Sequence, residues 1–199
     1  MKFEKIALLL TLMGLFVAGL VFIFVVAERG PELANGKRCP SGTEIVGAAP
    51  PDSYEQWCRR KHDSVKEGSY IKWGCLGRKK EEAEYKNGKR ESLTTWYENG
   101  RRTEEAEFKD GEKEGRQTTW YENGQKMVES EIRDGKNEGL WTYWYENGQK
   151  KMEGMYQNGR AEGRWMYWHP NGKKRKEVEY EEGEWKRCRT FERAGSWEQ

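Results

Sequence analysis

The sequence has few of the residues on which enzyme active sites are usually built. Its 199 residues include two histidines, His62 and His169, and no motif pairs either one with a serine or cysteine nucleophile. Gly-rich phosphate loops are also lacking. His169 stands where other copies of a repeat carry tyrosine, and His62 lies in a charged connector. We therefore expect no catalytic residues, and the sequence predicts that the protein is not an enzyme.

The chain also lacks a marked excess of charge of either sign. Lysine and arginine number 36 and aspartate and glutamate 34, which gives a formal net charge of +2. A nucleic-acid-binding protein normally shows a clear basic excess, so we expect no nucleic-acid partner. The four cysteines form no C-x-x-C pair and have no histidine pair nearby, which argues against zinc. No metal, cofactor or small-molecule substrate is expected.

One long apolar run is present, from Ile6 to Ala27, and it contains no charged residue. At about 1.5 Å per residue, a helix of this length spans the roughly 30 Å hydrocarbon core of a bilayer. We predict an uncleaved signal anchor, because a cleaved signal peptide has a shorter apolar region. Cleavage after Val25-Val26-Ala27, with secretion, is the alternative. Lys2 and Lys5 favour residues 1–5 in the cytoplasm and the bulk of the chain outside.

The cysteine count of four is even, which is compatible with an oxidising compartment. Cys39 and Cys58 bracket a Pro- and Gly-rich stretch with little regular structure of its own, in a connector over residues 28–65. A disulfide between them would staple a loop that cannot build a core. The alternative is four free thiols in a cytosolic protein.

From residue 66 to residue 183 the sequence is periodic. Five tryptophans are spaced 23, 24, 24 and 24 residues apart, and each is followed by glycines four and fifteen residues later. Twelve residues after each tryptophan lies a large apolar or aromatic residue. This spacing predicts about five hairpin repeats in a single-layer antiparallel β-meander, with residues 184–199 as a cap or tail. The tryptophans are Trp73, Trp96, Trp120, Trp144 and Trp168.

Asn-Gly pairs recur within the repeats and favour two-residue type I′ turns. A turn at Asn147-Gly148 predicts that Tyr145 faces Lys150, Trp141 faces Gly154 and Gly139 faces Tyr156. Large rings would then lie opposite residues with little side chain. The second turn of each copy, such as residues 157–159, is expected to lead into a longer loop. Cys75 and Cys188 lie more than four repeats apart, so we expect no disulfide between them.

The motif W-Y-E-N-G-Q-K followed by x-N/D-G-x-x-E-G-x-W resembles the MORN-repeat variant of bacterial proteins often named YwqK-family antitoxins. The resemblance covers residues 66–183. It implies an elongated β-meander that mediates protein or membrane contacts, without catalytic residues. The antitoxin label implies a toxin partner. The stretch CPSGTEIVGAAPPDSYEQWC is similar to the cysteine-bearing lead-in before such arrays in some envelope proteins.

The five tryptophans share one phase and should line up on one face. Two interpretations remain open. Lysine and arginine stems could cover the indoles as a structural ladder, or the rings could form an exposed binding surface. The residues expected opposite them are Lys80, Thr103, Met127, Lys151 and Arg175. The candidate binding residues are Trp96, Trp120, Trp144, Trp168, Tyr97, Tyr121 and Tyr145.

The sequence thus favours a membrane-anchored binding or scaffold module that holds a protein partner at the cell envelope. One alternative is an antitoxin or immunity protein that neutralises a toxin. The other is lipid-surface association by the array, which the near-zero net charge weakens because basic residues supply about 1 kcal/mol each near anionic lipid.

Overall fold

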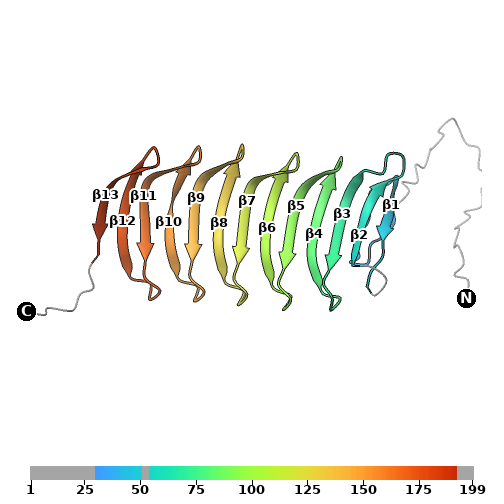
Figure 1. Ribbon diagram of the computed structural model, residues 1–199, viewed down its shortest axis with the longest axis horizontal. Helices are drawn as coiled ribbons and strands as arrows, with labels where there is room; N and C mark the ends of the chain where they lie inside the picture. Colours follow the sequence, from blue (N-terminus) through green and yellow to red (C-terminus); the bar gives the residue numbers. More distant parts are fainter. Residues whose placement is uncertain (1–29, 51–53, 192–199) are drawn as a thin grey trace, which may run out of the picture.

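A computed structural model describes residues 30–50 and 54–191 as one antiparallel sheet whose thirteen strands follow one another in sequence order (Figure 1). The predicted single-layer β-meander is therefore confirmed. The predicted anchor over residues 6–27 lies outside the described residues, and within those residues no helix is long and apolar enough to cross a membrane. The strands are β1 (Thr43–Gly47), β2 (Glu55–Arg60), β3 (Lys66–Trp73), β4 (Lys79–Lys86), β5 (Lys89–Trp96), β6 (Arg102–Lys109), β7 (Glu112–Trp120), β8 (Lys126–Arg133), β9 (Lys136–Trp144), β10 (Lys150–Gln157), β11 (Arg160–Trp168), β12 (Lys174–Glu181) and β13 (Glu184–Thr190).

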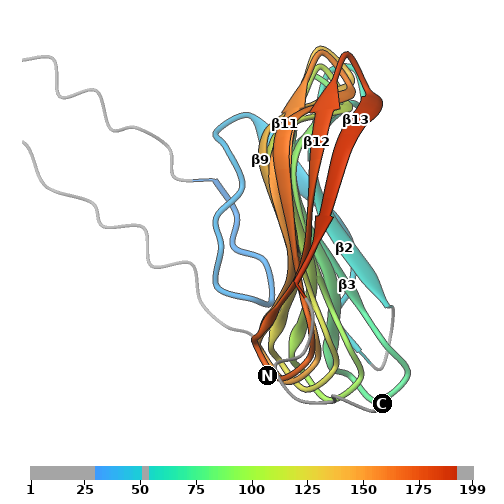
Figure 2. The same ribbon diagram turned by 90° about the vertical axis from the view of Figure 1, so that its left-hand side faces the viewer.

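The sheet extends beyond residues 66–183 at both ends. The connector over residues 28–65, expected to have little regular structure, contributes β1 and β2, and β13 comes from the predicted cap. Viewed end-on, the sheet is one twisted layer with residues 30–42 on one side (Figure 2). Because side chains alternate along a strand, the layer has two faces. We call them the ladder face, which bears Trp144 and its equivalents, and the aromatic face, which bears Trp141 and Tyr143.

The Asn-Gly turns differ from the prediction. Tyr145 N–H donates to the Gln149 carbonyl at 2.8 Å and Gly148 N–H to the Tyr145 carbonyl at 2.9 Å. Gly148 has a φ of 81° whereas Asn147 does not have positive φ, so the loop has three residues and a glycine bulge rather than a two-residue type I′ turn. The Asn147 side chain accepts from the Gln149 N–H at 3.0 Å, which stabilises this conformation.

The bulge also shifts the predicted pairing near these turns by one residue. Lys150 pairs with Trp144 and not with Tyr145. The residues paired with the five tryptophans are consequently not Lys80, Thr103, Met127, Lys151 and Arg175. They are the residues one position earlier, Lys79, Arg102, Lys126, Lys150 and Lys174.

The two-residue type I′ turns are found at the other ends of the strands, opposite the Asn-Gly loops. Asn158 and Gly159 have φ values of 50° and 82°, and Gln157 pairs directly with Arg160 across the turn. The prediction that residues 157–159 lead into a longer loop is therefore wrong. The same positive-φ pairs occur at residues 87–88, 110–111, 134–135 and 182–183.

Further from the turns, the predicted pairing is confirmed. Trp141 pairs with Gly154 and Gly139 with Tyr156. The reason for each glycine differs, however. Gly139 has a φ of 69°, which favours glycine, whereas a Cβ atom on Gly154 would overlap the indole ring of Trp165 in the next strand.

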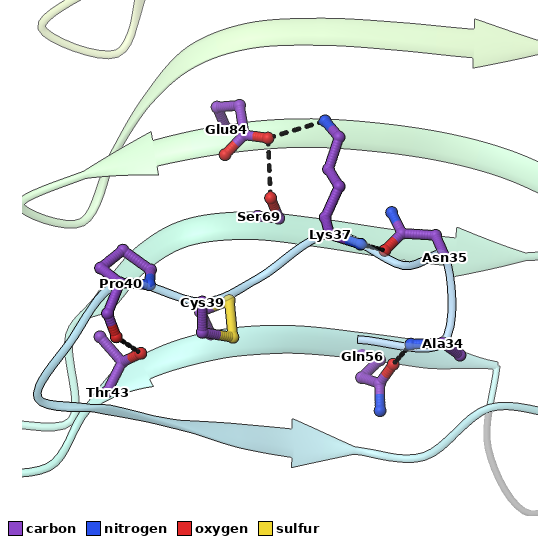
Figure 3. Close-up of a disulfide and its surroundings, with 10 residues drawn as sticks. Ala34, Asn35, Lys37, Cys39, Pro40, Thr43, Gln56, Ser69 and Glu84 are labelled. Atoms are coloured by element: carbon purple, nitrogen blue, oxygen red, sulfur yellow. Dashed lines mark hydrogen bonds and ion pairs between the residues drawn. A yellow bond between two sulfur atoms is a disulfide. The ribbon is translucent and has the colours of Figure 1, made fainter. Parts of the chain in front are cut away.

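The N-terminal end of the ladder face is covered by residues 30–42. Cys39 and Cys58 form the expected disulfide, with their Cα atoms 5.5 Å apart (Figure 3). Cys75 and Cys188 are free and exposed. Lys37 Nζ lies 2.9 Å from carboxylate oxygens of both Glu82 and Glu84. Beneath this cover the sheet has one of its most buried side chains, Ile71, which is 1% exposed.

Candidate binding surface

The predicted binding tryptophans are half-buried on the ladder face, where lysines of the preceding repeat cover three of the four. Lys79 Nζ lies 5.0 Å from the ring centroid of Trp96, Lys126 Nζ 5.7 Å from that of Trp144, and Lys150 Nζ 5.9 Å from that of Trp168. Each of these lysines also pairs with the glutamate three residues later, at 2.8, 3.1 and 2.5 Å. These ring faces are thus already in contact with the chain's own side chains, as the structural interpretation of the ladder expected.

The predicted binding tyrosines directly precede the three-residue loops and join successive repeats. The hydroxyl groups of Tyr97, Tyr121 and Tyr145 donate to the carbonyl oxygens of the next repeat's tryptophan at 2.9, 2.8 and 3.0 Å. Asn123 adds a bond from its side-chain amide to the Glu146 carbonyl at 2.6 Å. Burial raises the pKa of Tyr121 above its ordinary value. The described contacts of these tyrosines are therefore structural.

At the other ends of the strands, hydrogen bonds at the two-residue turns also join adjacent repeats. A Glu138 carboxylate oxygen accepts from the Asn158 N–H at 2.8 Å, and the Gly159 N–H donates to the Asn137 carbonyl at 2.9 Å. Equivalent carboxylate-to-turn bonds join Glu67 to Asn87, Glu114 to Asp134 and Glu162 to Glu182. Side chains thus connect adjacent repeats at both ends of the strands, and these bonds restrict the movement of one repeat relative to the next.

The N-terminal half of the aromatic face combines rings with charges. Lys66 Nζ lies within 4.5 to 5.1 Å of the ring centroids of Trp57, Tyr70 and Tyr85. Arg90 lies over Tyr85 at 5.7 Å and also bonds to the Glu81 carboxylate at 3.0 Å. Further along, Lys113 pairs with Glu104. Cations and carboxylates therefore occupy this half of the face.

The C-terminal half of the same face carries four rings in edge-to-face contact across β9 to β12, which we call the aromatic row. The centroids of Trp141 and Tyr156 are 5.1 Å apart, those of Tyr156 and Trp165 5.0 Å, and those of Trp165 and Tyr180 6.0 Å. Within the described part of the chain, no second layer covers this row. Trp165 in this row is 3% exposed, and the other three rings are half-buried.

Tyr143, Met152 and Tyr167 flank the aromatic row and pair with one another across β9, β10 and β11. Burial raises the pKa of the Tyr143 phenol, and burial together with a hydrogen bond to Tyr180 raises that of Tyr167. Lys176 extends over the Tyr167 ring at 4.5 Å. The cluster is therefore mostly uncharged, with phenol groups and one ammonium group as its polar atoms.

Sequence reasoning missed this surface because it followed the invariant spacing of the repeats. The signal was a change between copies at equivalent positions. Gln117 and Thr119 in one repeat become Trp141 and Tyr143 in the next and Trp165 and Tyr167 in the one after. The predicted register already placed these residues on one face of the sheet.

Over residues 30–50 and 54–191, no group of three or more histidine, cysteine, aspartate or glutamate side chains is arranged to hold a metal ion. The residues that contact one another on both faces are instead aromatic rings, cations and carboxylates in repeating pairs. Such a surface can recognise a partner by shape, ring contact and charge.

The profile of the MORN repeat variant matches three consecutive repeats, at residues 113–134, 137–158 and 161–182. These three repeats are therefore MORN repeats of this variant, which favours a binding or scaffold module. No curated protein matches the sequence. Among solved structures, a chain of the Glycosylation Associate Protein (Gap123) complex from Streptococcus agalactiae is similar, with 12% identity and a TM-score of 0.34 over 53% of this chain. The match spans 19% of that chain's length.

Proposed function

We propose that the protein is a membrane-anchored module that holds a protein partner outside the cytoplasm, with the aromatic row and its flanking residues as the binding surface. The observation that carries the proposal is that no second layer covers the row of Trp141, Tyr156, Trp165 and Tyr180 within the described residues, whose rings are half-buried except for the buried Trp165. Interface cores are enriched in tyrosine and tryptophan and depleted in charge. A sheet whose repeats are joined by side-chain hydrogen bonds at both ends of the strands loses little conformational entropy on binding.

A protein partner fits this surface better than a lipid bilayer. Anionic headgroups are attracted by clustered lysine and arginine, whereas Lys176 is the one cation placed on the rings of this cluster. The N-terminal apolar run supports anchoring, and Lys2 and Lys5 support an extracytoplasmic array. The Cys39–Cys58 disulfide supports the same location, because disulfides persist in oxidising compartments.

Strand β10 offers a matched pair of variants that test the binding face. Met152 lies on the aromatic face, at the position where earlier repeats carry Glu81 and Glu104. Met155 lies on the ladder face, at the position of Glu107 and Glu131. Both positions therefore tolerate glutamate in this fold, and neither Met152→Glu nor Met155→Glu should lower the melting temperature by more than a few degrees.

Capture of partners from native membranes should separate the two variants. We expect Met152→Glu to lose the proteins that the parent chain retains, because it places an unpaired charge among the rings, and Met155→Glu to retain them. Equal capture by both variants, or loss with Met155→Glu alone, would contradict the proposal. Liposome co-sedimentation of the same proteins provides the control for binding to lipid.

A further inference from the structure

Strand β13 ends the sheet, and no described strand pairs with its outer edge. All seven of its residues are exposed. An open edge presents backbone N–H and C=O groups to which another extended chain can add as a further strand. Three of its seven residues are basic, Lys186, Arg187 and Arg189, and one is acidic, Glu184.

The interior strands of the sheet show which residues lie on either side of a strand that occupies the place of β13 in the repeat. On the ladder face, the middle residue of each odd-numbered interior strand from β5 to β11 lies between glutamates of its two neighbours. Thr142, for example, pairs with Glu129 on one side and Glu153 on the other. The residues in this position are uncharged in all four strands, as Thr94, Thr118, Thr142 and Met166.

The corresponding residue of β13 is Arg189, which pairs with Glu177 on its inner side. Arg187 lies on the same face and pairs with Glu179. Within the described residues, no ion pair joins either guanidinium group to a carboxylate. Between the two arginines, Cys188 occupies the aromatic face opposite Val178. The edge thus carries two cations, two residues apart. In the repeat pattern, the next strand beside them would carry acidic residues.

A second copy of β13 does not satisfy this edge. In an antiparallel pair of two such strands the ladder faces coincide, so that arginines of one copy oppose arginines of the other. Like charges in directly opposed positions destabilise strand pairing. Charge complementarity therefore favours a different, acidic occupant.

We propose that β13 binds an extended acidic segment of a partner protein by antiparallel strand addition. The segment carries carboxylates at two alternate positions, Glu-x-Glu, which face Arg189 and Arg187, and the residue between them faces Cys188. This is how β12 already pairs on the inner side of the strand, through Glu177, Val178 and Glu179. The site is separate from the aromatic row and does not depend on it.

A synthetic peptide of residues 101–110, RRTEEAEFKD, provides a suitable probe because its Glu105 and Glu107 occupy this alternate pattern within β6. The peptide is titrated against the full-length chain in detergent. We expect saturable binding with protection of β13 amides from hydrogen exchange. The double variant Arg187→Glu with Arg189→Glu should bind it about tenfold more weakly or worse, since both cross-strand attractions become repulsions. A peptide with lysines at those two positions should regain affinity for the double variant.

A cysteine at peptide position 106 tests the register. Directly opposed residues have Cβ atoms about 4.5–5.5 Å apart, close to what a disulfide requires. With oxidised glutathione as oxidant, the peptide should cross-link to Cys188 and not to the exposed Cys75. Moving the cysteine to position 105 should abolish the cross-link.

Undetectable binding at millimolar peptide would overturn the proposal, as would equal binding to the parent chain and the double variant. Protection of β13 in a self-associated chain without peptide would assign the edge to a second copy and would also overturn it. Met152→Glu should bind the peptide as the parent does, so that a failure of the aromatic surface and a failure of this edge can be distinguished.

Discussion

At the scale of single residues, the sheet uses glycine for two separate reasons. Gly163 has a φ of 67°, and a Cβ atom there would meet nothing within 4 Å, so the requirement is conformational. Gly154 lacks positive φ and instead leaves room for the Trp165 ring. The equivalent positions in other repeats carry Ala83, Ala106, Ser130 and Val178, the last of which pairs with Trp165. The small residue Gly154 therefore lies against a large ring, that of Trp165, in the strand that follows.

These two glycines predict different responses to substitution. Gly154→Ala should lower the free energy of unfolding by about 1–3 kcal/mol, because the methyl group overlaps Trp165. Adding Trp165→Leu should recover part of this loss. Gly163→Asn should be nearly neutral, because asparagine tolerates positive φ. Thermal melts of the four proteins measure this, and a Gly154→Ala variant as stable as the parent would exclude the packing described for Trp165.

The buried phenols predict a pH dependence. Folding raises the pKa of Tyr143 and Tyr167, so the unfolded chain loses these protons first as the pH rises. The stability that they contribute is complete below about pH 10 and is lost as the pH rises through their folded pKa values. Tyr167→Phe should therefore flatten the fall in melting temperature above pH 10. An unchanged slope would show that this phenol does not titrate as its burial indicates.

At the scale of elements, the strands of residues 66–183 and the pairing of their central residues could be predicted from the sequence, but the turns could not. Periodicity placed Trp141 opposite Gly154 and Gly139 opposite Tyr156, because side-chain alternation and the large-small pattern are local properties. Asn147-Gly148 misled because Asn-Gly suits both a type I′ turn and the last two residues of a three-residue loop. What decides between them is the bonding of the Asn147 side chain and its bridge to the Pro170 carbonyl at 2.7 Å, which joins residues of different repeats.

The proposed binding surface was less predictable than the fold. The spacing identified Trp144 and Tyr145, yet the lysine of the preceding repeat covers the first, and the hydroxyl of the second bonds to the next repeat. Their contacts cross repeat boundaries and depend on the twist and bulges of the sheet. Differences between copies, such as Thr119 against Tyr143, indicate the surface better than the residues that all copies share.

The loop tyrosines therefore predict a loss of coupling between repeats. Tyr145→Phe removes the hydroxyl bond to the Trp168 carbonyl and should lower the free energy of unfolding by about 0.5–1.5 kcal/mol. Denaturant unfolding measures the effect. Lys173→Ala, in an exposed position of the next loop, is the control and should change stability little. If Tyr145→Phe were equally neutral, the hydroxyl bond would not hold the repeats together.

At the scale of the whole molecule, the array is quasi-one-dimensional, so a contact at one end stabilises mainly the strands near that end. At the N-terminal end, the Cys39–Cys58 disulfide and the Lys37 ion pairs hold residues 30–42 on the ladder face. Replacing both cysteines with serine should remove about 3 kcal/mol from this end. Hydrogen exchange should then accelerate in β1 to β4 and stay unchanged in β9 to β12. Uniform acceleration would show that the array unfolds as one unit.

The location of the array is a second prediction at this scale. Protease added to intact spheroplasts should digest the repeats, because the cationic flank of the apolar run is N-terminal. Protection until lysis would reverse the topology and remove the support that the disulfide gives to an extracytoplasmic site.

The measurement that tests the central claim most directly is site-specific photo-cross-linking in native membranes. A photoreactive phenylalanine is placed at position 152 on the aromatic face in one protein and at position 155 on the ladder face in another. The strand is the same, and the two side chains differ in the face that they occupy. A covalent adduct with a partner protein should form from position 152 and not from position 155. Adducts from position 155 alone, or equally from both positions, would contradict an aromatic binding face.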